Sequence, residues 1–168
     1  GSPFLFLNGG AANICPRIDR QESFDSVDSL ASQFVADYDQ TRQLPEEASE
    51  DDSIRGVDRY VMLPRKNRDI EDGKGRLAKV RLQGLRIGPI RIVTFPGEVF
   101  SQTAEAVKSK FKDSLVMVCS YASGGSAGYV PVSEAYDTGG YEVRVSPYSE
   151  EAEAVLRSEF LALLEGLS

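Results

Sequence analysis

Residues 79–95, KVRLQGLRIGPIRIVTF, alternate apolar with basic or polar side chains on both sides of Gly88-Pro89. This alternation predicts a hairpin or two adjoining strands with one face buried, because successive side chains of a strand point to opposite faces. The apolar pair Ile92-Val93 in the second half is typical of a central strand. The segment therefore predicts that the chain is built around a β-sheet.

Further helices and strands are predicted on both sides of this segment. Apolar residues at helical spacing predict helices within residues 23–42, 96–111 and 149–164, with Ser23 as an N-cap and Glu98 in the first helical turn. Apolar or alternating runs predict strands at residues 4–9, 59–64, 114–122 and 141–147. This order predicts an α/β to α+β fold, in which helices flank a mixed β-sheet.

The composition limits the classes of function. The 168 residues, 41% hydrophobic and 27% charged, are typical of one soluble globular domain. A net charge of −7 argues against nucleic acid or an anionic membrane as a partner. The absence of histidine excludes a Ser-His-Asp triad and a histidine zinc site formed by this chain alone. Cys15 and Cys119 lie at no metal-binding spacing.

The start of the chain suggests a shortened protein. Gly1-Ser2 resembles a cloning scar, and Pro3-Phe4 enters a strand-like run with no preceding cap or turn. We therefore expect residues 3–168 to form a single domain that is the C-terminal portion of a larger one. The missing part would normally cover apolar sheet surface or strand edges, so we expect the shortened chain to self-associate.

Three glycine-rich loops follow predicted strands: residues 8–16 (NGGAANICP), 96–98 (PGE) and 123–129 (SGGSAGY). Ligands collect beyond the carboxyl ends of strands in such sheets, and glycine lets the backbone approach them closely. Glu98 and Tyr129 are the ionisable groups that stand out, although Glu98 could equally favour a helix N-terminus and Tyr129 could simply pack. SGGSAG is only weakly similar to a phosphate-binding loop, because no Lys-Ser/Thr pair or clear helix follows it.

Three motifs in this order resemble the neutral/alkaline non-lysosomal ceramidase family: FLNGGAANICPR, LRIGPIRIVTFPGEVF and GYVPVSEAYDTGGYEV. The resemblance extends from Phe4 to the final helix and corresponds to the C-terminal part of that family's catalytic domain. It implies a zinc-dependent amidase that hydrolyses the N-acyl bond of a ceramide or a similar lipid. Family members are often secreted or membrane-associated, but the sequence does not define a compartment.

The resemblance also implies roles for individual residues. Zinc in the family is held by two histidines, a glutamate and a tyrosine, of which the last two match Glu98 and Tyr129. A further family tyrosine contacts the substrate carbonyl and matches Tyr141, which leaves Tyr136 for packing. A neighbouring cation lowers the pKa of a phenol enough for it to bind zinc, and a phenol is also a good donor to a developing oxyanion.

The chain departs from the family in two respects. Both histidine ligands would lie upstream of its first residues, so Glu98 and Tyr129 supply at most half of a tetrahedral site. We therefore expect the chain alone to bind zinc weakly and to be inactive. Gly9 occupies the position of a family serine, which leaves Asn8 and Asn13 as polar groups of the substrate loop.

Two functions remain open at this point. The first is part of a ceramidase-like zinc amidase that takes a lipid-like N-acyl substrate. The alternative is a non-catalytic binding or interaction domain derived from the same fold, in which the glycine-rich loops serve binding. The distance between Glu98 and Tyr129 distinguishes the two, because metal ligands must converge on one point.

Overall fold

The computed structural model describes residues 5–16, 23–41, 50–67, 71 and 73–167. The chain forms two compact units, one of Gly1–Ile14 with Asp51–Ser168 and one of Cys15–Glu50. The single domain predicted for residues 3–168 stays a prediction. Within the described residues, no helix combines the length and the apolar character needed to cross a membrane.

The smaller unit contains helix α1, Phe24–Thr41. Ser23 caps its start, because the Ser23 Oγ accepts a hydrogen bond from the Ser26 N–H at 3.2 Å. This contact confirms the predicted N-cap. None of the residues of α1 is buried, and its apolar side chains are largely exposed: Phe24, Val27, Phe34, Val35 and Tyr38.

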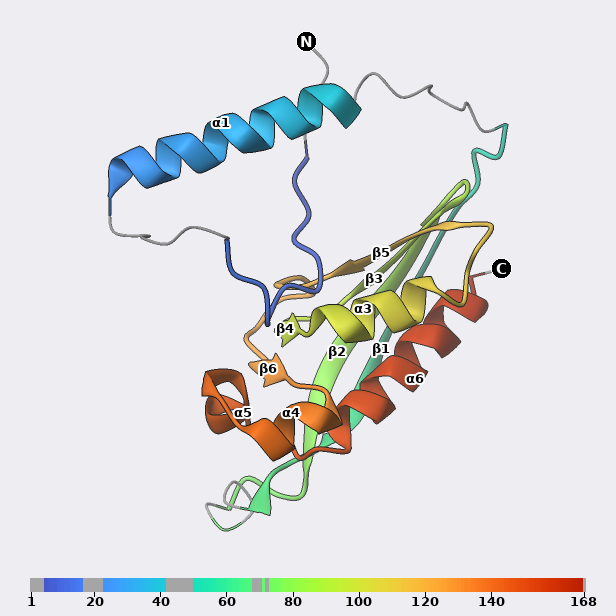
Figure 1. The fold of residues 1–168 in the computed structure, drawn as a ribbon. Helices are drawn as coiled ribbons and strands as arrows, with labels where there is room; N and C mark the ends of the chain where they lie inside the picture. The colour runs from blue at the N-terminus through green and yellow to red at the C-terminus, as the bar shows by residue number, and fades with distance from the viewer. Residues whose placement is uncertain (1–4, 17–22, 42–49, 68–70, 72, 168) are drawn as a thin grey trace. The chain divides into compact units, whose positions relative to one another are not determined.

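The larger unit is built on a four-stranded sheet with the order β1-β2-β3-β5, shown in Figure 1. The strands are β1 (Ile54–Pro64), β2 (Leu77–Ile87), β3 (Ile90–Thr94) and β5 (Leu115–Cys119). β2 and β3 form the predicted hairpin, in which Ile87 pairs with Ile90 across Gly88-Pro89. β1, β2 and β3 are antiparallel and β5 is parallel to β3, so the mixed sheet and its helices confirm the predicted fold class.

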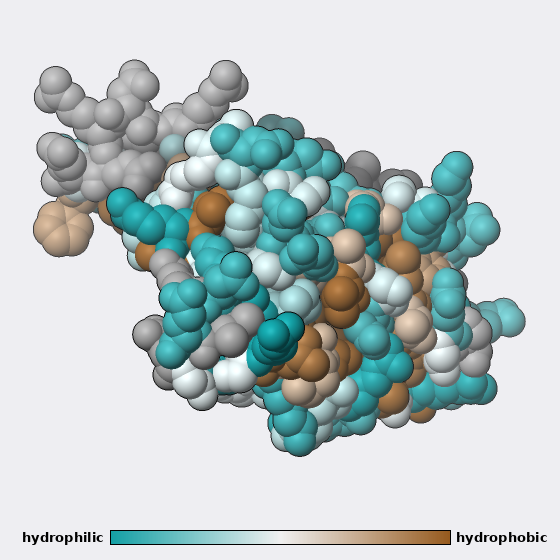
Figure 2. All heavy atoms as spheres, turned by 90° about the horizontal axis from the view of Figure 1, so that it is seen from below, coloured by the Kyte–Doolittle hydropathy of each residue, from teal (hydrophilic) through white to brown (hydrophobic). Residues whose placement is uncertain are grey.

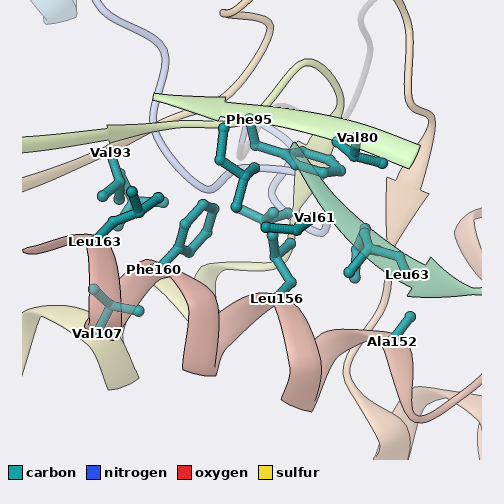
Figure 3. Close-up of a cluster of buried hydrophobic side chains, with 14 of the residues drawn as sticks. Val61, Leu63, Val80, Val93, Phe95, Val107, Ala152, Leu156, Phe160 and Leu163 are labelled. Carbon is teal, nitrogen blue, oxygen red and sulfur yellow. The ribbon is translucent and has the colours of Figure 1, made fainter. Parts of the chain in front are cut away.

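Two helices cover one face of this sheet. α3 (Ser101–Lys108) contacts β5, α6 (Ala152–Glu165) contacts β1, β2 and β3, and the two helices contact each other (Figure 1). Figure 3 shows side chains of the sheet and of α6 pointing toward one another in the core between them. All five predicted core residues of the last helix are buried: Ala152, Leu156, Phe160, Leu163 and Leu164.

Side chains of the sheet that point away from α6 are more exposed. In β2, Ala78, Val80 and Leu82 are buried, whereas the alternate residues Leu77 and Lys79 are exposed. The exposed hydrophobic residues of the strands include Tyr60, Met62, Leu77, Ile87 and Leu115. The face of the molecule in Figure 2 carries its hydrophobic side chains in several groups set among hydrophilic ones. The self-association expected from the sequence stays a prediction.

The predicted N-terminal strand is absent from the described part of that segment. Residues 5–9 form no strand, and Leu5 and Phe6 are exposed. The segment does touch the end of β5, because the Ser120 N–H donates to the Asn8 carbonyl at 2.9 Å. A short apolar run predicts burial only where a partner strand covers it, and the described residues 5–9 lie in no strand pair.

Two further predictions of local structure were wrong. Residues 141–147 were predicted as a strand, but Tyr141–Val145 form the short helix α5 after Gly139-Gly140. Both glycines have positive φ, +75° and +118°, which sets a sharp change of direction before the helix. Glu98 lies on a two-residue strand and not in the first turn of a helix, since α3 begins only at Ser101.

Leu156→Ala should lower the free energy of unfolding by about 2–5 kcal/mol, because it removes a fully buried side chain between α6 and the sheet. Val155→Ala is the matched control on the same helix, where the side chain is 36% exposed. The control should cost less than about 1 kcal/mol. Urea unfolding of both variants measures the difference, and equal losses would contradict this description of the core.

Candidate functional site

Two short strands hold the candidate site. β4 (Glu98–Val99) pairs in parallel with β6 (Tyr129–Val130), and Glu98 is the register partner of Tyr129. Register partners on parallel strands project to the same side of the pair. The Glu98 carboxylate and the Tyr129 phenol therefore lie together, close enough for Glu98 to raise the pKa of the phenol. The structure brings together the two residues that the sequence singled out from separate loops.

Glycine precedes both residues, and the two glycines are in contact. A Cβ atom on Gly97 would lie 2.2 Å from the Gly128 carbonyl oxygen and 2.7 Å from the Phe95 ring. The Glu98 N–H donates to the same Gly128 carbonyl at 2.9 Å. Gly128 itself has a φ of +75°, a conformation that favours glycine. Only glycine at position 97 allows the two segments to approach this closely.

The hydrogen bond to Glu98 raises the pKa of Tyr129 to about 12, with further contributions from burial and from the negative charge of Glu98. Tyr129 is therefore a neutral hydrogen-bond donor near neutral pH. A cation bound at the same place would act in the opposite direction, because positive charge favours the phenolate.

Tyr121 is a third member of the site that the sequence analysis missed. Hydrogen bonding to Glu98 raises the pKa of Tyr121 to about 12. Its backbone has a φ of +57°, and its N–H donates to the Gly97 carbonyl at 3.0 Å. A non-glycine residue in this region is strained, and such strain is concentrated at functional sites. The available signal was its place just after β5 and before the glycine-rich loop.

Tyr141 joins the site through its ring. The Tyr129 and Tyr141 rings meet edge to face, with centroids 6.0 Å apart. Tyr141 is 55% exposed, and the Arg144 guanidinium lies 5.7 Å from its ring centroid. Tyr136 has a different environment, because its hydroxyl donates to the Tyr148 carbonyl at 2.9 Å. That contact fits the packing role predicted for Tyr136.

The N-terminal glycine-rich loop, residues 8–16, is hydrogen-bonded to the residues that follow Glu98. The Asn13 Oδ1 accepts a hydrogen bond from the Ser101 N–H at 2.8 Å and so satisfies the start of α3. The Ala12 N–H donates to the carbonyl of Val99, next to Glu98. Gly9 is exposed, and a Cβ atom added there would lie 4.0 Å from its nearest neighbour, so a serine would fit. Substrate binding by Asn8, Gly9 and Asn13 stays a prediction.

The described residues contain no group of three or more His, Cys, Asp or Glu side chains that could hold a metal ion. Glu98 and Tyr129 place two oxygen donors side by side, which fits part of a four-coordinate zinc site but does not complete one. A metal at this point would need further ligands from elsewhere.

Comparisons with known proteins bear on the fold. No family model matches the sequence, and no curated protein matches it. The solved structure of neutral ceramidase from Pseudomonas aeruginosa matches with a TM-score of 0.64 and 17% identity over 96% of this chain. A structure described as ceramidase complexed with C2 matches with a TM-score of 0.46 and 22% identity over 53% of this chain and 15% of that one.

The match to the Pseudomonas enzyme covers 35% of that enzyme's chain. This chain therefore has the fold of part of neutral ceramidase and spans about a third of that protein's length. The resemblance noted in the sequence is confirmed at the level of the fold.

Gly97→Ala should destabilise the protein by about 1–3 kcal/mol, because the new methyl group would overlap the Gly128 carbonyl. Gly56→Ala is the control, since the nearest atom to a methyl group there is 3.9 Å away. Thermal unfolding compares the two. A Gly97→Ala protein as stable as the control would show that the two glycine segments are not in contact.

Titration of tyrosine absorbance tests the hydrogen bonds to Glu98. Tyr121 and Tyr129 should ionise at about pH 12 in the wild type and at lower pH in Glu98→Gln, where the negative charge is gone. Because both pKa values are raised in the folded state, this stabilisation is present below the usual phenol pKa of about 10 and is lost as the pH rises through 12. Buried Tyr148, whose pKa is also raised to about 12, should ionise late in both proteins.

Proposed function

We propose that this chain is part of a zinc-dependent amide hydrolase that resembles neutral ceramidase and cleaves the N-acyl bond of a lipid-like substrate. The pairing of Glu98 with Tyr129 supports the proposal most directly, because it joins the two oxygen donors that such a site requires from this chain. The likeness to neutral ceramidase supports the fold on which that site would be built.

In the proposed site, Glu98 and Tyr129 hold the zinc ion. The ion, when bound, acts as a Lewis acid toward the amide carbonyl. The Tyr141 hydroxyl donates a hydrogen bond to the carbonyl oxygen, where negative charge develops during hydrolysis. Arg144 places positive charge beside the Tyr141 ring and favours the orientation in which that ring meets Tyr129.

The remaining ligands come from outside this chain, because it contains no histidine. The chain alone is therefore inactive and binds zinc weakly in this proposal. The alternative, a non-catalytic binding domain on the same fold, requires neither metal nor an N-acyl substrate. Measurements on a longer protein that contains this chain together with the proposed histidine ligands would separate the two functions.

Glu98→Gln in the longer protein should lower the zinc content and reduce fatty-acid release from a short-chain ceramide by at least about 100-fold. Tyr141→Phe should retain zinc and lower kcat by roughly 100-fold, because it removes one donor to the developing charge. Metal analysis and fatty-acid release are measured on the same samples.

Tyr136→Phe is the matched control, on the short helix α4 (Ser133–Thr138) that precedes Tyr141. It removes a hydroxyl that donates to the Tyr148 carbonyl, so it should cost about 1 kcal/mol of stability and leave kcat and zinc unchanged. Unchanged zinc and activity in Glu98→Gln would contradict the proposed site. A wild-type protein with no zinc and no amidase activity would favour the binding domain.

A further inference from the structure

A polar cavity of about 600 Å³ lies beside the candidate site. Its walls come from β1, β2 and the segment between them, from Pro96, from the loop of residues 123–127, and from Pro147-Tyr148. Pro96 lies two residues before Glu98, and Ala127 lies two residues before Tyr129. The segments that contain Pro96 and Ala127 therefore belong both to the wall of the cavity and to the chain just before the site. The side chains that line the cavity are different from those of the site.

Cationic side chains are concentrated on the walls of this cavity: Arg65, Lys74, Lys79 and Arg81. None of the described residues that line it is acidic. The chain as a whole has a net charge of −7, so the positive charge of the cavity wall is opposite in sign to the charge of the whole chain. Such a concentration attracts anions.

Of these cations, Arg65 and Lys79 are the ones on which binding of a ligand would depend. Arg81 pairs with Asp58, which lies outside the lining, and both side chains are about 40% exposed. The Lys79 Nζ lies 4.2 Å from the Tyr60 ring centroid, and a ring face supplies no oxygen acceptor. Arg65 also lines the cavity, so its guanidinium charge adds to the attraction for an anion there.

The glycines of the loop that lines the cavity are exposed and have positive φ. Ser123, Gly124 and Gly125 have φ values of +73°, +73° and +81°. No atom lies within 4 Å of the position that a Cβ atom would take on Gly124 or Gly125. Positive φ, and not crowding, therefore favours glycine at these two positions. Uncovered backbone N–H groups in such loops are suited to anions.

We propose that this cavity binds the phosphate group of a phosphomonoester. A phosphate dianion offers several acceptor oxygens at once, which suits Arg65, Lys79 and the loop backbone together, and guanidinium groups bind phosphate well. The cavity has the volume of a small-molecule site and leaves room for the esterified part of the ligand. The sequence indicated such a loop only weakly because its cations come from β2 and from the segment between β1 and β2, and not from the loop itself. The inference does not depend on zinc at Glu98.

The test is an NMR titration of the chain with glycerol 3-phosphate, inorganic phosphate and acetate at constant ionic strength. Saturable shifts of the Gly124 and Gly125 amides are expected with both phosphates, with tighter binding of the ester and no saturation by acetate. Absence of a saturable shift at these glycines with up to about 10 mM ester would overturn the proposal, as would binding of inorganic phosphate that excludes the ester.

Charge-removing variants distinguish specific binding of the ester in the cavity from nonspecific attraction to the positive charges of the protein. Lys79→Gln and Arg65→Gln should each weaken binding of the ester about tenfold, because each removes a charged donor. Lys110→Gln changes the net charge equally but lies outside the cavity, so it should change the affinity less than about twofold. Lys79 is exposed, so its variant should fold even if Arg65→Gln does not. Equal weakening by Lys79→Gln and Lys110→Gln would overturn the proposal.

Discussion

The contact between Gly97 and Gly128 is the constraint on which the candidate site depends. With any side chain at position 97, the Gly128 carbonyl could not lie where it accepts the Glu98 N–H. That backbone bond sets the register of β4 and β6, and the register places Glu98 beside Tyr129. A carboxylate and a phenol that are 31 positions apart in the sequence thus become neighbours through two residues that have no side chains.

The two segments that meet at this contact face two chemically different surroundings, one with phenols and a carboxylate and one with cationic side chains. Beside Glu98, three phenols gather around one carboxylate: Tyr121 and Tyr129, whose pKa values Glu98 raises, and Tyr141, whose ring contacts the Tyr129 ring. The cavity bounded by Pro96 and residues 123–127 is instead lined by cationic side chains. A ligand in the cavity would contact the segments that lead directly to Glu98 and Tyr129.

Sequence patterns predicted the parts of the fold that depend on periodicity. The β2–β3 hairpin followed from alternation, and the core face of α6 followed from helical spacing. The pattern was insufficient at Tyr141–Val145, because five residues that alternate in polarity can also form one and a half helical turns. It also failed at Leu5 and Phe6, because an apolar run carries no information about whether another strand covers it.

The candidate site was only partly accessible from the sequence. Glu98 and Tyr129 could be named from the family resemblance, but their register came from a contact between glycines that no local pattern encodes. Tyr121 was hidden because it follows an apolar strand and its positive φ depends on the path of the loop. The cationic cavity was hidden for a similar reason, since Arg65 and Lys79 approach the loop only when the sheet has formed.

The most direct test of this account is measurement of proton–proton NOEs around the glycine contact. The account predicts cross-peaks between the α protons of Gly97 and the backbone protons of Gly128, and between the side-chain protons of Glu98 and the ring protons of Tyr121 and Tyr129. If these cross-peaks are missing while those across the β2–β3 hairpin are present, the sheet is formed but the site is not, and the account is contradicted.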